Sequence, residues 1–276
     1  SVAGGEFNVA IGNYSLDALT SGDDNIAIGY NAGTAISSGF NNTLIGKNAG
    51  QTITTGARNT FVGYQAGDGF DGETHNVGFG ENALGGPIAG GEYNVAVGSN
   101  TLLALTSADH CVAVGYQAGS AVTEGTGSTF IGYQAGLNNT TAQDNVAVGK
   151  NAGNGFTTGG RNIAIGFASI FNADEETNNL AIGYSSLSGS VAGGEYNVAI
   201  GNLSLDALTS ADKNVAVGYE AGTEITTGGG NTLVGHEAGK TIDTGTFNTF
   251  FGFEAGHAFD AETNNLGIGA NALGGS

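Results

Sequence analysis

A repeat of 17 residues constrains this chain more than any other feature. A pentad of the form Asn, Val/Ile/Thr/Leu, small or apolar, Val/Ile/Phe, Gly occurs sixteen times, always at 17-residue steps except for 18-residue steps from Asn76 to Asn94 and from Asn179 to Asn197. A unit this short cannot bury its own apolar face and must stack on its neighbours. The repeat therefore predicts an all-β fold, a parallel β-solenoid of about sixteen coils.

Each unit has the pattern of two short strands and two tight turns, and no segment has the length or period of a helix. The first residue of each pentad is predicted to form a ladder in which each side-chain amide bonds the next along the axis. Cys111 and Ser128 interrupt this ladder, and we interpret Cys111 as a ladder defect rather than a nucleophile. The predicted ladder residues are Asn8, Asn25, Asn42, Asn59, Asn76, Asn94, Asn145, Asn162, Asn179, Asn197, Asn214, Asn231, Asn248 and Asn265.

The middle residue of each predicted strand carries an expectation about oligomeric state. It is always apolar or Gly, as are most of its neighbours, and a strand that is apolar on both faces is normally buried on both. In all five copies that begin with Thr, this middle residue is large. We therefore expect parallel self-association, or alternatively a wide monomeric solenoid whose loops cover the second face. The predicted interface residues are Leu44, Phe61, Phe130, Leu233 and Phe250.

Several units resemble known repeat families. Asn59 to Gly67 reads NTFVGYQAG, Ser128 to Gly136 reads STFIGYQAG, and Asn8 to Gly12 reads NVAIG. These resemble the head repeats of YadA-type trimeric autotransporter adhesins and, more closely, the NTFIGYQAG repeats of phage tail-fibre and tail-fibre-like proteins. The resemblance implies a left-handed β-roll that assembles as a parallel homotrimer. The adhesin unit is typically shorter and has Ser second, so the phage family fits better.

A longer repeat overlies the short one. Residues 1–86 match residues 190–275 at an offset of 189, and the two long steps divide the chain into sub-blocks 1–86, 87–189 and 190–276 of a single repeat domain, 1–276. Both ends lack a cap. We expect either a segment of a longer fibre, which the absence of an initial Met favours, or ends that stack head to tail.

Charge and composition exclude several partners. The net charge of −19 comes from 25 acidic and only 6 scattered basic residues, so we expect no nucleic acid partner. No apolar run approaches the roughly 18 residues needed to span a bilayer, so we expect no membrane insertion of this segment. The four His residues are far apart and differ in register, which disfavours a catalytic cluster, and we expect no enzymatic activity.

One acidic feature has two interpretations. Glu220, Glu237 and Glu254 occupy one position in three consecutive coils, so their carboxylates are expected roughly 4.8 Å apart. They form either a solvated acidic stripe or a metal site, for which Ca²⁺ is the candidate. No other cofactor is expected.

Three functions remain open. The first is a structural and adhesive rod, a segment of a phage or phage-like tail fibre that supports attachment to a glycan or protein receptor on a host or cell surface. The second is the head of a bacterial trimeric surface adhesin; both imply an extracellular location, on a virion or a cell surface. The third is an ice-binding solenoid, suggested by Thr54-Thr55 and Thr226-Thr227, although adjacent residues point in opposite directions. Turn aromatics such as Tyr30, Tyr64, Tyr116, Tyr133 and Tyr219 either stack on sugars or cover the edge of the roll.

Overall fold

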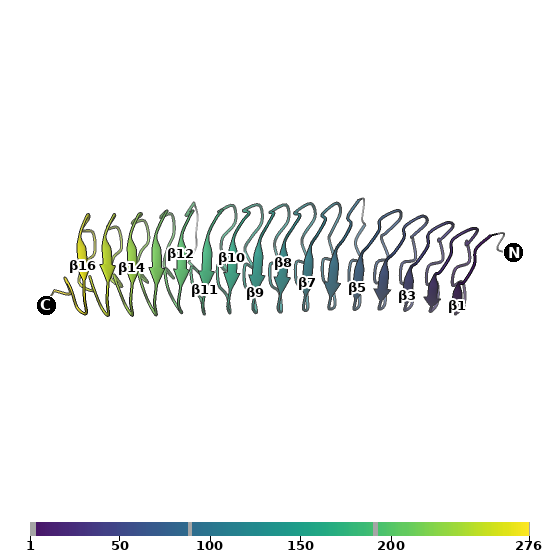
Figure 1. Ribbon diagram of the computed structural model, residues 1–276, viewed down its shortest axis with the longest axis horizontal. Helices are drawn as coiled ribbons and strands as arrows, with labels where there is room; N and C mark the ends of the chain where they lie inside the picture. The colour runs from purple at the N-terminus through teal and green to yellow at the C-terminus, as the bar shows by residue number, and fades with distance from the viewer. Residues whose placement is uncertain (1–3, 88–89, 190–192, 276) are drawn as a thin grey trace. The chain divides into compact units, whose positions relative to one another are not determined.

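The computed structural model describes residues 4–87, 90–189 and 193–275, and its regular elements in those ranges are all β-strands. The chain forms two compact units, Ser1–Thr141 and Ala142–Ser276. Their boundary lies inside the sub-block 87–189 and not at a long step of the repeat. Each unit is a β-solenoid whose strands lie side by side in chain order (Figure 1).

Every strand is three residues long and covers the second to fourth residues of a pentad. The first unit contains β1 (Val9–Ile11), β2 (Ile26–Ile28), β3 (Thr43–Ile45), β4 (Thr60–Val62), β5 (Val77–Phe79), β6 (Val95–Val97), β7 (Val112–Val114) and β8 (Thr129–Ile131). The second unit contains β9 (Val146–Val148), β10 (Ile163–Ile165), β11 (Leu180–Ile182), β12 (Val198–Ile200), β13 (Val215–Val217), β14 (Thr232–Val234), β15 (Thr249–Phe251) and β16 (Leu266–Ile268).

Within each unit, successive strands pair in parallel so that equivalent residues stack. Val9 pairs with Ile26 and Ala10 with Ala27, a step of 17 residues. Across the long step, Val77 pairs with Val95, so the extra residue is absorbed outside the strand. The register confirms the predicted stacking of equivalent positions.

The prediction of two strands in each unit was wrong, because each coil contains a single strand. The remainder of the coil consists of turns and bends, which still bond the next coil; the N–H groups of Thr20 and Ser21 both donate to the Ser37 carbonyl oxygen, at 2.9 and 3.0 Å. These turns contain residues with a positive φ. Gly12 has a φ of +133°, and a Cβ there would lie 2.5 Å from the Gly29 carbonyl oxygen, so the fifth position needs Gly for both reasons.

From β2 onward, the middle residue of each strand is buried, and in interior coils it packs with later apolar residues of the same coil. In the coil of β4, these are Phe61, Ala66 and Phe70, all fully buried. The Phe61 and Phe70 rings lie 4.8 Å apart. Gly67 leaves room for them, because a Cβ there would lie 2.2 Å from Phe61.

The predicted interface residues are therefore interior. Leu44, Phe61, Phe130, Leu233 and Phe250 all have no exposed surface within the single chain, so they cannot meet another chain. Each is followed six residues later by a Gly, as Phe61 is by Gly67, whereas coils with a small middle residue can carry Leu there, as Ala199 and Leu205 do. The Gly six residues later therefore accommodates the large middle residue inside its own coil.

Candidate functional site

The Asn ladder is present, and it is buried except at Asn8 and Asn265, which are half-buried. Asn25 donates its Nδ2 to the Gly39 carbonyl oxygen at 2.8 Å, and its backbone N–H donates to Asn8 Oδ1 at 2.9 Å. Asn42 repeats this geometry, with its backbone N–H 3.1 Å from Asn25 Oδ1. Each Asn side chain thus links a carbonyl oxygen in its own coil to a backbone N–H of the next coil. Direct amide-to-amide bonds, such as Asn25 Nδ2 to Asn8 Oδ1 at 3.2 Å, are secondary.

Cys111 replaces an Asn in this ladder, as predicted. Its backbone N–H donates to Asn94 Oδ1 at 2.9 Å, and its Sγ lies 3.2 Å from the Gly125 carbonyl oxygen, where an Asn would place its Nδ2. The thiol is free and buried. Burial raises the pKa of the Cys111 thiol, which disfavours the thiolate that a nucleophile requires.

The outward side of the strands forms an uncharged, largely apolar surface in each unit. The first and third residues of each strand point away from the core, and we call the surface that they form in each unit the strand face. Five of these outward residues are Thr; the others are Val, Ile, Leu or Phe, and none is charged. Its most exposed residue is Ile268 at 69%, whereas many others, such as Ile45 and Ile200, are half-buried. Both sides of each strand are apolar, as predicted. The middle residue, which was predicted to face another chain, lies in the core, and the first and third residues face outward.

Stacked rings flank the strand face. Beside the ends of β7 and β8, the rings of Tyr116 and Tyr133 lie 5.5 Å apart, and in the second unit Tyr219 stacks on His236 at 5.2 Å. Each ring covers one face of its neighbour, and Tyr116, Tyr133 and Tyr219 remain 44%, 46% and 44% exposed.

Two of the histidines share a register that sequence analysis missed. His75 and His110 each precede the ladder position of their coil and lie on either side of Tyr93, with ring separations of 4.8 and 5.3 Å. The expectation that all four His differ in register was wrong. Counting positions backward from each pentad, as well as forward, would have found this stack.

A lysine lies at the acidic stripe. The Lys240 ammonium is ion-paired with Glu220, and it lies 3.4 Å from Glu237 Oε1. The hydrogen bond from Lys240 holds the pKa of the Glu220 carboxyl below its usual value. Across the described ranges, no three His, Cys, Asp or Glu side chains are arranged to hold a metal ion.

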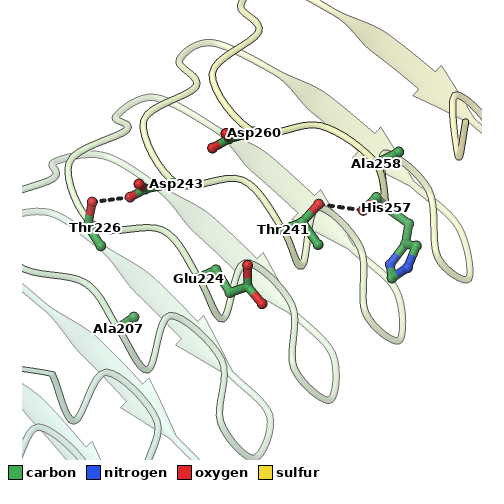
Figure 2. A pocket seen from close by; sticks show the side chains of 8 residues that line it. All are labelled: Ala207, Glu224, Thr226, Thr241, Asp243, His257, Ala258 and Asp260. Atoms are coloured by element: carbon green, nitrogen blue, oxygen red, sulfur yellow. Dashed lines mark hydrogen bonds between the residues drawn. The ribbon is translucent and has the colours of Figure 1, made fainter.

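An acidic groove lies on the turns of the second unit (Figure 2). One wall carries Glu224 and Thr241, and the other carries Thr226, Asp243 and Asp260. Both Thr hydroxyls of the groove have partners, since Thr226 donates to the Asp243 carboxylate and Thr241 to the His257 carbonyl oxygen, whereas the buried His257 Nδ1 has none. These hydrogen bonds join one coil to the next.

Comparisons with known proteins identify no relative. No protein-family model matches the chain, and neither a curated protein nor a solved structure matches it significantly. The described part of the chain also contains no helix that is long and apolar enough to cross a membrane.

Proposed function

We propose that this chain is a non-enzymatic structural and adhesive rod, a segment of a phage or phage-like tail fibre that supports attachment to a receptor on a host surface. The strand face is the observation that carries this proposal. In a chain of net charge −19, the outward positions of the strands carry no charge at all. A monomer rarely exposes an apolar patch beyond a few hundred Å².

The strand face is best covered by identical strand faces. Parallel copies in register would bring Val, Ile and Thr columns together, which buries apolar surface without burying a charge. The family resemblance implies three copies and a left-handed roll, and we adopt both in the proposal. The acidic turns then lie outside, where mutual repulsion keeps assemblies apart.

The alternative functions have less support. An adhesin head would use the same trimer, but its repeat matches this chain less well. Ice binding needs free hydroxyl columns, whereas Thr20, Thr106 and Thr123 donate their hydroxyls to carbonyl oxygens of the next coil at 2.8, 3.0 and 3.1 Å.

The proposal is tested by the mass of the native protein and of one matched pair of variants. Val217 is an outward residue of β13, and Ser210 is exposed outside the strand face of the same unit. We expect native mass spectrometry to give three chains of 27.2 kDa for the wild type and for Ser210→Lys, and a single chain for Val217→Lys. A monomeric wild type, or a trimer unaffected by Val217→Lys, would refute lateral association through this face.

A further inference from the structure

Two columns of side chains border the strand face, one on each side. The residue directly before each pentad forms the entry border, and the residue directly after it forms the exit border. Ring contacts follow both columns, because His75, Tyr93 and His110 stack along the entry border and Tyr116 stacks on Tyr133 along the exit border. The pentad separates the two borders of a coil, so they flank the strand face from opposite sides.

The borders differ in charge from the rest of the chain. They contain five of the six basic residues but only three of the 25 acidic ones, although they are two positions in a coil of 17. All eight of these side chains are exposed. The basic ones are Lys47, Arg58, Lys150, Arg161 and Lys213, and the acidic ones are Asp24, Glu81 and Asp144. When two strand faces come together, the charges that meet are therefore those of the borders.

The direction of packing decides which borders meet. In a closed ring of parallel copies, the entry border of one copy meets the exit border of the next, because every copy faces the axis in the same sense. An antiparallel pair would instead bring each border against its own kind. Since the two borders carry different residues, the sequence distinguishes these arrangements.

The borders of the second unit match when each coil meets the same coil of the next copy. At β9, Asp144 on the entry border then meets Lys150 on the exit border, an opposite-charge pair. At β10, Arg161 meets Phe167, and β13 pairs a Lys with a Tyr in the same way. A cation beside an aromatic ring can bury its aliphatic stem without meeting a like charge. In the described part of this unit, no coil brings like charges together.

Registers shifted by one coil match less well in this unit. A shift in one direction would put Arg161 against Lys150, which are like charges. The opposite shift would put Asp144 against Phe167, which leaves the carboxylate without a cation. Only the unshifted register gives both the acid and the base of β9 and β10 a suitable neighbour.

The first unit agrees with the unshifted register but does not require it. Coil by coil, Arg58 meets Tyr64 and His75 meets Glu81. A shift of one coil would pair Arg58 with Glu81, which is also favourable. The choice of register therefore depends on the second unit.

We propose that in the lateral assembly the entry border of each copy binds the exit border of the next, coil against the same coil, and that contact between Asp144 and Lys150 fixes the register. This inference rests on the proposed lateral association and names the residues of the second copy that take part in it. The strand face supplies the apolar area, and the borders supply orientation and specificity. It also explains why a chain of net charge −19 places its basic residues beside its uncharged surface.

Charge reversal at one coil tests the contact. Asp144→Lys makes both borders positive at β9, and Lys150→Asp makes both negative, so either variant alone has like charges at this contact. A trimer that contains both variants has one like-charge contact, whereas a trimer of one variant has three. Both residues are exposed, so neither change alters the core.

The two variants, one of them isotope-labelled, are refolded together in equal amounts, and native mass spectrometry gives the composition of each trimer. Trimers of one variant should be at least about threefold rarer, relative to mixed trimers, than random assembly gives, because mixing replaces two like-charge contacts by opposite-charge ones. High salt should abolish this preference. As a control, Glu175→Lys makes the same charge change at an exposed residue outside the borders and should mix randomly with wild type.

A pair of cysteine variants measures the register. Asp144→Cys with Lys150→Cys places the two thiols at one coil, whereas Asp144→Cys with Phe167→Cys places them one coil apart. After mild oxidation, denaturing mass analysis should show covalent trimers mainly from the first pair. The native Cys111 is buried and is present in both proteins.

The outcomes separate this inference from the lateral association on which it rests. Trimeric wild type with random mixing of the two charge-reversed variants, or stronger cross-linking from the shifted pair, would overturn the inference and leave lateral association in place. Monomeric wild type would refute lateral association and this inference with it. Variants that form trimers only when mixed would support both.

Discussion

Replacing Phe61 and Gly67 together tests whether the middle residues of the strands are core residues. Phe61→Ala alone removes a fully buried ring that packs on Phe70 and is expected to cost about 3–5 kcal/mol of unfolding free energy. Gly67→Leu alone forces a Cβ to within 2.2 Å of Phe61, and overpacking of this kind costs about 1–3 kcal/mol or more.

The double variant should recover most of this loss. The coil then has a small middle residue and a Leu six residues later, the same pair that occurs naturally as Ala199 and Leu205. Leu205 has a φ of +51°, which is the left-handed conformation that position 67 requires. We expect a coupling of at least about 2 kcal/mol between the two changes, within the range found for contacting residues.

Urea denaturation followed by circular dichroism gives the four free energies, and hydrogen exchange of the β4 amides localises the effect. Ala66, which is also buried in this coil, remains unchanged in all four proteins. If the two costs simply add, or if Phe61→Ala lowers association without lowering the stability of the chain, the interior assignment of Phe61 is wrong.

Three further outcomes follow from the ladder, the core and the acidic stripe. Asn214→Ala should cost about 1–3 kcal/mol, because it leaves the buried Asn231 N–H, now 2.9 Å from Asn214 Oδ1, without its acceptor. Urea titration measures this cost, and a neutral effect would contradict it. Asn139→Leu should raise the melting temperature, because both polar atoms of the buried Asn139 amide lack hydrogen-bond partners. Removing such a buried polar group is worth about 1–3 kcal/mol. A lower melting temperature would count against this. Because Glu220 has a lowered pKa in the fold, its pairing with Lys240 stabilises above the usual carboxyl pKa and is lost as the pH falls through the lowered value. Lys240→Met should therefore destabilise by under about 1 kcal/mol at pH 7 and by nothing in strong acid, and EDTA should leave the wild-type melting temperature unchanged; a drop in EDTA would indicate a bound metal.

The spacing of the repeat predicted the position of each strand, but it did not show which side of the strand faces the core. Val9, Ala10 and Ile11 are all apolar, so hydropathy does not distinguish the two sides. Alternation links residues two apart, and the ladder residue Asn8 therefore shares a side with Ala10. A buried ladder implies a buried middle residue, and this inference was available from the sequence.

The second strand was mispredicted for a different reason. The Ser, Thr and Asp residues after Leu19 or Ile36 are compatible with a short strand or with a bend. Left-handed residues such as Asn31 and Gly33 set the direction in which the chain enters this segment. Hydrogen bonds such as the one from the Thr20 N–H to the Ser37 carbonyl oxygen form only when the whole coil is closed. Local propensity does not describe this closure.

The sequence by itself determined the number of coils, the position of each strand and the ladder residues, because a fixed period allows only one stacking register. The tertiary structure decided which side of each strand faces inward and which carboxylates join the coils. Glu73 and Gly90 are 17 residues apart, like any other stacked pair. Only the folded turn brings Glu73 Oε1 onto the Gly90 N–H, at 2.9 Å.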